Sequence, residues 1–195
     1  MDTSIQERKM ENEMNAKSND ANNNNNNPGT VTIEGGYATL QYERRLPHSP
    51  EVVWKAITDP KEVTVWFNTT AKVDARLGGT LEYIAVPVGF RRTGRILAWD
   101  PLHVFEHEWH IDPHPQFPKG DTESVIRWEL VRDSNDTIVT MTHRRLAKDT
   151  SLRFAVGWHA FLDRLAAHLN GENLPDQKER SAAVIGLYTA QYAAQ

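Results

Sequence analysis

The side chains best suited to chemistry cluster in residues 103–115, HVFEHEWHIDPHP. His103, His107, His110 and His114 match zinc ligands in type and number. Successive residues of a strand point to opposite faces, so 103 and 107 share one face while 110 and 114 share the other. The four rings cannot converge on one ion without a bulge. We therefore predict no metal site, and nothing else in the sequence indicates a cofactor.

His107 is one of two histidines expected inside the protein, and His143 is the other. Either ring can hydrogen-bond a ligand, or act as a general base if a carboxylate orients it. The alternative is a pair of core histidines satisfied by backbone carbonyls. Glu106 and Glu108 should face the opposite way, and no Ser or Asp stands at a triad-like spacing. We assign no catalytic residue, so enzymatic activity stays open and a binding role is favoured.

These residues must be positioned by stretches in which apolar and polar residues alternate with the period of a β-strand. A first stretch covers residues 37–46, and five or six more lie between residues 71 and 146. Gly-Gly, Asp-Pro and Asp-Ser-Asn-Asp turns join them, which favours an antiparallel meander. The proline-rich residues 111–121 predict an irregular flap.

Helices are predicted before and after the main run of strands in the sequence. Ser49-Pro50 and Asp59-Pro60 each place an N-cap residue before a proline, which indicates two short helices. Residues 151–170 predict a long amphipathic helix, because apolar residues recur at spacings of three and four before Gly171. A weaker helical pattern follows in residues 181–195.

The sheet face under the long helix is rich in aromatic rings, and the helices add more. Such an arrangement favours an apolar pocket with a few polar groups, although the same rings can simply fill a solid core. Strand alternation also places Ala98 on this face. The candidate ligand-binding residues of the cavity are Trp66, Phe67, Tyr83, Phe105, His107, Trp109, Trp128, Met141, His143, Phe154, Trp158 and Phe161.

Four charged residues, in two adjacent pairs, are candidates for parts of the site or of the solvent-exposed surface. Arg91 and Arg92, next to Phe90, can guard the cavity mouth and favour an anionic ligand, or can be exposed residues that confer solubility. Asp163 and Arg164 are predicted to form a solvated polar face of the long helix.

Composition limits the class of protein. The chain has 195 residues, a formal net charge of -4 and no cysteine. We predict a disordered Asn-rich tail over residues 1–30, one domain over residues 31–171 and a helical C-terminal extension over residues 172–195. The charge gives no attraction to nucleic acid, and no disulfide is possible. With neither a signal peptide nor a membrane span in the sequence, we expect a cytoplasmic protein.

The order of elements, together with several local motifs, resembles the SRPBCC (START-like, helix-grip) superfamily. Within it the chain is similar to the family named for the activator of heat-shock protein 90 ATPase. The motifs that carry the likeness are residues 49–54 (SPEVVW), 65–67 (VWF), 76–80 (RLGGT), 94–97 (GRIL) with Asp100-Pro101, and 157–165 (GWHAFLDRL). The resemblance covers roughly residues 37–171. It implies an α+β fold in which a curved antiparallel sheet of six or seven strands wraps around a long C-terminal helix.

The resemblance also implies a function. Members of the superfamily bind lipids, sterols, polyketides or other apolar molecules between sheet and helix. We therefore expect binding of an unidentified hydrophobic small molecule. The alternatives are an interaction protein that acts on a chaperone ATPase, and a cavity enzyme of cyclase or hydrolase type. A protein partner stays possible, as do a monomer and a homodimer.

Overall fold

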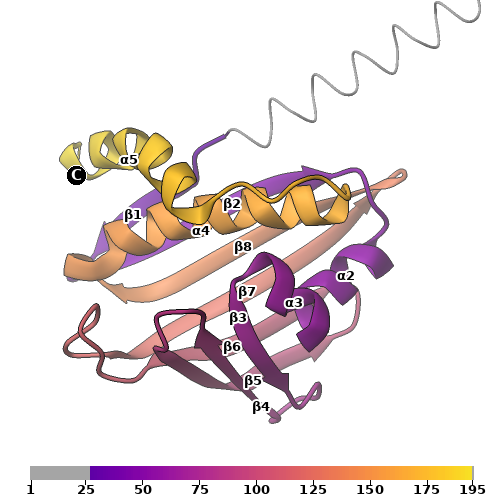
Figure 1. Cartoon of the computed structure of the whole chain (residues 1–195), viewed down its shortest axis with the longest axis horizontal. Helices are drawn as coiled ribbons and strands as arrows, with labels where there is room; N and C mark the ends of the chain where they lie inside the picture. Colours follow the sequence, from indigo (N-terminus) through magenta and orange to yellow (C-terminus); the bar gives the residue numbers. More distant parts are fainter. Residues whose placement is uncertain (1–26, 195) are drawn as a thin grey trace, which may run out of the picture.

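The computed structural model of the chain describes residues 27–194, and residues 1–26 of the predicted tail lie outside them. The chain runs from one sheet strand to the next, with short helices inserted early and longer helices at the end (Figure 1). The elements are β1 (Thr30–Glu34), β2 (Tyr37–Leu46), α2 (Pro50–Thr58), α3 (Pro60–Trp66), β3 (Thr69–Val73), β4 (Thr80–Ala85), β5 (Arg91–Asp100), β6 (Val104–Ile111), β7 (Asp121–Asp133), β8 (Asp136–Ala147), α4 (Lys148–Leu169) and α5 (Gln177–Ala193).

The eight strands form one antiparallel sheet in the order β1-β2-β8-β7-β6-β5-β4-β3. This sheet curves around α4, which lies along its concave face, while α2 and α3 lie toward the opposite end of that face (Figure 1). The helix-grip architecture is therefore confirmed. The sheet has eight strands, one or two more than the six or seven predicted.

The additional strand is β1, which begins at Thr30, the last residue of the predicted tail, and otherwise lies in the predicted domain ahead of its first predicted strand. Its sequence TVTIE does alternate, with Val31 buried and Thr30 and Thr32 exposed. The following Gly35 and Gly36 both have positive φ, +56° and +86°, and form the tight turn into β2. Five residues at the start of the predicted domain were too short a pattern to be recognised as a strand.

Local signals explain the helices. Asp59 caps α3, with its carboxylate accepting a 2.9 Å hydrogen bond from the Lys61 N–H. Ser49 occupies the N-cap position of α2 without a side-chain cap bond. α4 starts at Lys148, directly after β8, and ends before Gly171, whose φ is +67°. Among residues 27–194, no helix is long and apolar enough to cross a lipid bilayer.

A β-bulge in β5 overturns one assignment of strand faces. The pairing of β5 with β6 shifts register between Ile96 and Ala98. As a result Ala98 is not in the buried core, and Trp99 instead packs on Trp54 at a ring-centroid distance of 5.1 Å. The prediction for Ala98 was wrong because strict alternation cannot anticipate a bulge.

Asp163 and Arg164 are not a solvated face. Arg164 is only 7% exposed. It donates hydrogen bonds to the carbonyls of Trp66 (2.8 Å) and Pro175 (2.6 Å) and to the Asn68 side chain (2.7 Å). Asp163 is mostly buried and accepts a 2.5 Å bond from Arg180 of α5. Helix periodicity could not reveal these partners, because they belong to other elements.

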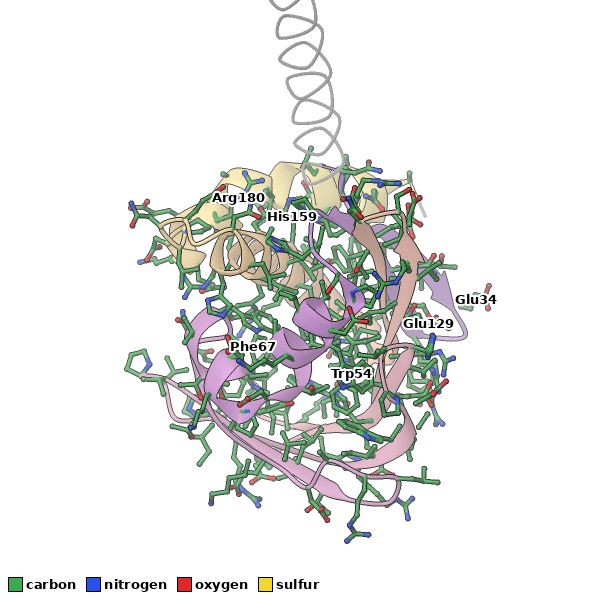
Figure 2. All side chains as sticks on the ribbon, turned by 90° about the vertical axis from the view of Figure 1, so that its right-hand side faces the viewer. Glu34, Trp54, Phe67, Glu129, His159 and Arg180 are labelled. Atoms are coloured by element: carbon green, nitrogen blue, oxygen red, sulfur yellow. The ribbon has the colours of Figure 1, made fainter. Side chains whose placement is uncertain are left out.

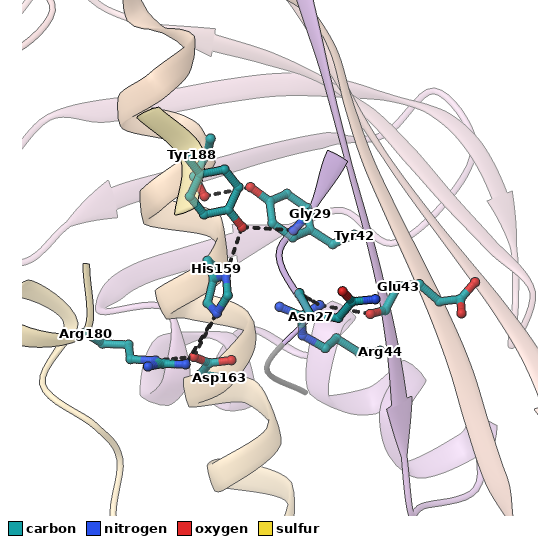
Figure 3. A network of polar contacts seen from close by, with 10 residues as sticks. Asn27, Gly29, Tyr42, Glu43, Arg44, His159, Asp163, Arg180 and Tyr188 are labelled. Atoms are coloured by element: carbon teal, nitrogen blue, oxygen red, sulfur yellow. Dashed lines mark hydrogen bonds and ion pairs between the residues drawn. The ribbon is translucent and has the colours of Figure 1, made fainter. Parts of the chain in front are cut away.

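Both ends of the described chain are fastened to α4 through Tyr188 (Figure 3). The Tyr188 hydroxyl accepts a 3.0 Å hydrogen bond from the Gly29 N–H and lies 2.8 Å from His159 Nδ1. The second ring nitrogen of His159, Nε2, lies 3.5 Å from the Asp163 carboxylate. Beside it, the Tyr42 hydroxyl donates to the carbonyl of Ala155. The C-terminal helix α5 is therefore an integrated part of the packed structure.

Three histidines are buried and held neutral. Burial lowers the pKa of His107 to about 4 and that of His159 to about 3. Burial also holds the pKa of His143 well below its usual value. Each therefore resists protonation in the folded protein.

We expect Tyr188→Phe to lower the free energy of unfolding by about 1–2 kcal/mol, because Gly29 and His159 both lose their partner. Urea denaturation measures this. Tyr83→Phe is the matched control, since that hydroxyl has no hydrogen-bond partner among residues 27–194. Equal losses in the two variants would contradict the proposed fastening.

The buried histidines also predict a pH dependence of stability. In the unfolded chain they protonate near pH 6.5, whereas in the folded protein burial lowers the pKa of His107 to about 4, that of His159 to about 3 and that of His143 well below its usual value. Stability should therefore fall as pH drops from about 6.5, by up to about 1.4 kcal/mol per pH unit for each histidine. His143→Gln should reduce the slope between pH 6.5 and 5 by about a third. The exposed His103→Gln is the control, and an unchanged slope in His143→Gln would contradict this assignment.

Candidate functional site

A pocket of about 390 Å³ opens between α4, the sheet and two loops. Its size falls in the range of about 300–1,000 Å³ that is typical of small-molecule sites. α4 contributes Phe154, Gly157, Trp158 and Phe161, and Phe67 projects from the end of α3. In Figure 2, Phe67 points into the interior between the short helices and the sheet, whereas Glu34 and Glu129 lie on the outside. The interior walls are therefore mainly aromatic.

The rim of the pocket is formed by the β4–β5 loop, the β6–β7 loop and the start of α5. A 3.1 Å hydrogen bond from His114 Nε2 to the carbonyl of Val88 joins the first two loops. Arg153 of α4 donates a 2.8 Å bond to the carbonyl of Gln116 in the second loop. These contacts hold the rim in place around the opening.

The structure divides the twelve candidate cavity residues into groups. Five line the open pocket: Phe67, Trp109, Phe154, Trp158 and Phe161. Three of these, with Trp66, Tyr83, Phe105, His107 and Trp128, also enclose a separate void of only about 10 Å³, which is no larger than one water. Met141 and His143 are fully buried and line neither space. One end of the aromatic interior is thus packed core, and the other end is open.

Neither candidate histidine is oriented by a carboxylate in the described residues. His107 Nδ1 donates a 2.9 Å hydrogen bond to the carbonyl of Glu108. His143 Nδ1 accepts a 2.9 Å bond from the indole of Trp158, so its proton lies on Nε2. The orienting groups are thus a backbone carbonyl and an indole, and neither ring is paired with a carboxylate as the histidine of a catalytic triad is.

Arg92 and Arg91 differ sharply in environment. Arg91 is exposed and pairs with Glu82 at 2.6 Å and Asp112 at 3.3 Å. Arg92 lines the pocket and is only 3% exposed. Its guanidinium lies over the rings of Phe90 (4.4 Å) and Phe67 (4.8 Å). Of the two arginines that were predicted to guard the cavity mouth, only Arg92 therefore lines the cavity.

Several buried donors around this pocket lack a protein acceptor. Within residues 27–194, Arg92 Nε, Trp109 Nε1 and His143 Nε2 have no hydrogen-bond partner. Arg92 and Trp109 are on the pocket wall, and His143 packs behind it against Phe154 and Trp158. Buried donors normally find an acceptor, so this group is a feature to be explained.

Sequence reasoning missed several pocket residues. The loop residues Phe90 and Phe117 were not chosen, although their rings meet at 5.3 Å above the pocket. Gly157 could have been identified from the sequence, because a glycine there interrupts the apolar stripe of a long helix. A Cβ built there meets nothing within 4 Å, so this glycine leaves open space on the pocket side of α4.

A charged surface depression and the four histidines of residues 103–114 are the other candidate sites. A broader depression of about 730 Å³ lies on the outer face of β4–β6, but its wall is charged and shallow, with Lys72, Glu82, Arg91 and Arg95. His103 and His107 do not share a strand face as alternation predicted, because His103 lies in the turn before β6 and is exposed whereas His107 is buried. In the described part of the chain, no three histidine or acidic side chains gather as metal ligands.

Solved structures share this fold. CalU16 from Micromonospora echinospora is 20% identical, with a TM-score of 0.63 over 84% of this chain and 94% of that one. EF2215 from Enterococcus faecalis is 16% identical, with a TM-score of 0.65 over 84% and 91%. DynU16, from the dynemicin biosynthetic locus, is 20% identical, with a TM-score of 0.60 over 71% of this chain and 50% of that one. A search of curated protein sequences finds no significant match.

A family model provides the classification. Residues 47–170 match the model described as Activator of Hsp90 ATPase homolog 1-like protein. The match runs from α2 to the end of α4, and so includes most of the pocket wall. The chain belongs to the Activator of Hsp90 ATPase homolog 1-like family, within the SRPBCC superfamily.

Proposed function

We propose that the protein binds an apolar small molecule in the pocket between α4 and the sheet. The observation that carries this proposal is the open space of about 390 Å³ beside Gly157, walled by Phe154, Trp158 and Phe161. Aromatic walls remove apolar ligand surface from water at about 25 cal/mol per Å² and restrict the ligand's orientation.

The packing of the neighbouring interior supports this proposal. On the far side of Phe67, Trp109 and Trp158, which line both spaces, the rings leave a void of only about 10 Å³. The chain can therefore close this interior with aromatic side chains, and at α4 it carries a glycine instead. A relative in fold, DynU16, comes from a biosynthetic locus, which supports a role with small molecules.

The alternative of a chaperone-directed interaction protein rests on the family match over residues 47–170. Exposed Val86 and Val88 on the β4–β5 loop offer a small apolar contact surface. An Hsp90 ATPase rate that does not change on adding the protein would remove this alternative. The cavity-enzyme alternative has less support, because His107 is bonded to the Glu108 carbonyl and His143 to the Trp158 indole, and neither is paired with a carboxylate.

Filling the pocket should abolish binding without unfolding the protein. N-phenyl-1-naphthylamine, an uncharged dye, should quench the fluorescence of Trp109 and Trp158 saturably in the wild-type protein. Gly157→Leu places a side chain in the open space and improves helix propensity, so we expect at least about ten-fold weaker dye binding with no loss of thermal stability.

Gly186→Leu is the matched control. Gly186 also lies in a helix with nothing within 4 Å of a built Cβ, but it is exposed on α5 and outside the pocket wall. Its dye affinity should equal that of the wild type. Unchanged affinity in Gly157→Leu, or no saturable binding by the wild type, would contradict the proposed function.

A further inference from the structure

The environment of Arg92 indicates which class of apolar molecule the pocket binds, an inference that rests on the proposed function. Arg92 projects from β5 into the pocket wall, and its side chain is almost entirely buried. Apart from burial, the neighbouring group that acts on its charge is Tyr83, which is not a carboxylate. The guanidinium is therefore an internal cation with no internal counter-ion.

An unpaired cation is costly in a protein interior. Arginine side chains that are buried are normally paired with a carboxylate or phosphate, because desolvation is otherwise uncompensated. Burial here lowers the pKa of Arg92 to about 9, so the group keeps its charge at neutral pH. Nearby Arg91, which has two carboxylate partners, shows that the chain supplies such partners on the exposed face of the same strand.

Surrounding aromatic rings stabilise the cation but leave its donors unused. The guanidinium carbon lies 4.8 Å from the centroid of Phe67, 4.4 Å from that of Phe90 and 5.3 Å from that of Trp109. Ring faces interact with the charge. They accept no strong hydrogen bonds, and Arg92 Nε remains without an acceptor, as does the Trp109 indole N–H. The pocket wall therefore offers donors and lacks acceptors at this point.

The rim has the same electrostatic sign. Arg153 and Lys178 both line the opening. The single acidic residue of the lining, Asp176, already accepts a 2.8 Å hydrogen bond from the Glu179 N–H as the N-cap of α5. An approaching anion would meet the cations Arg92, Arg153 and Lys178 and one carboxylate, Asp176, so that positive charge predominates.

We propose that the pocket selects an apolar, ring-containing molecule bearing one oxyanion, a carboxylate or sulfonate, that pairs with Arg92. The oxyanion accepts hydrogen bonds from the guanidinium and from the Trp109 indole. Its apolar body lies along Phe154, Trp158 and Phe161. The binding energy comes from burial of the body, and the preference for an anion comes from the charge-assisted hydrogen bonds.

Two dyes of nearly the same shape test this. 1-Anilinonaphthalene-8-sulfonate carries one sulfonate, and N-phenyl-1-naphthylamine is the same skeleton without it. We expect the full-length protein to bind the sulfonate at least about ten-fold more tightly, as a charge-assisted hydrogen bond in a buried site allows. Gly157→Leu should weaken both dyes, which places them in the pocket.

Arg92→Met should remove the preference. It keeps the length and apolar character of the side chain, so the uncharged dye should bind within about two-fold of wild type while the sulfonate loses about ten-fold. Arg91→Met, which removes a cation one residue away on the exposed face, should keep the wild-type ratio. The thermal midpoint of ligand-free Arg92→Met should not fall, since the lost charge had no partner.

The outcomes are separable. If the wild type binds both dyes equally, or if Arg92→Met and Arg91→Met change the ratio alike, the anion preference is overturned while the pocket stands. If neither dye binds, the proposed function itself fails. A large fall in the midpoint of Arg92→Met would identify Arg92 as part of the scaffold and overturn its role in recognition. The comparison of the two dyes on the unaltered protein needs no variant.

Discussion

Arg164 joins the three segments whose separation defines the pocket. From the C-terminal part of α4 it donates hydrogen bonds to the carbonyl of Trp66 at the end of α3, the side chain of Asn68, and the carbonyl of Pro175 ahead of α5. Hydrogen bonds from a buried charge are among the stronger ones in proteins. Because all of them converge on one guanidinium, α4 is held at a set distance from α3, and α5 starts at the pocket rim.

With α4 fixed in this way, side-chain volume decides where the interior is solid. Trp158 of α4 stacks on Phe67 at 5.3 Å, and Trp66 and Trp128 meet at 6.3 Å behind them. Those rings close the interior under α2 and α3. Directly before Trp158 in α4, Gly157 contributes no side chain, and the loops that carry Phe90 and Phe117 curve over the space without filling it. The pocket is thus a consequence of the helix position combined with one small residue.

Much of the fold could be predicted because its signals are local. Strand alternation, the Asp59 cap and the stop at Gly171 all depend on neighbouring residues. The errors came from contacts between distant segments: the burial of Arg164 depends on residues almost a hundred positions earlier, and the bulge at Ala98 depends on pairing with β6. Aromatic residues of the interior were found, but their division between packed core and open wall depends on how far apart the elements stand.

The central claim is that this space accepts a ligand, and a crystal structure of the protein grown with 1-bromonaphthalene tests it most directly. Bromine scatters anomalously, so its position is seen without reference to the protein. We expect a bromine peak inside the pocket among Phe154, Trp158 and Phe161, with α4 unmoved. A well-ordered structure in which those rings close the space, and bromine lies only on the outer surface or is absent, would contradict it.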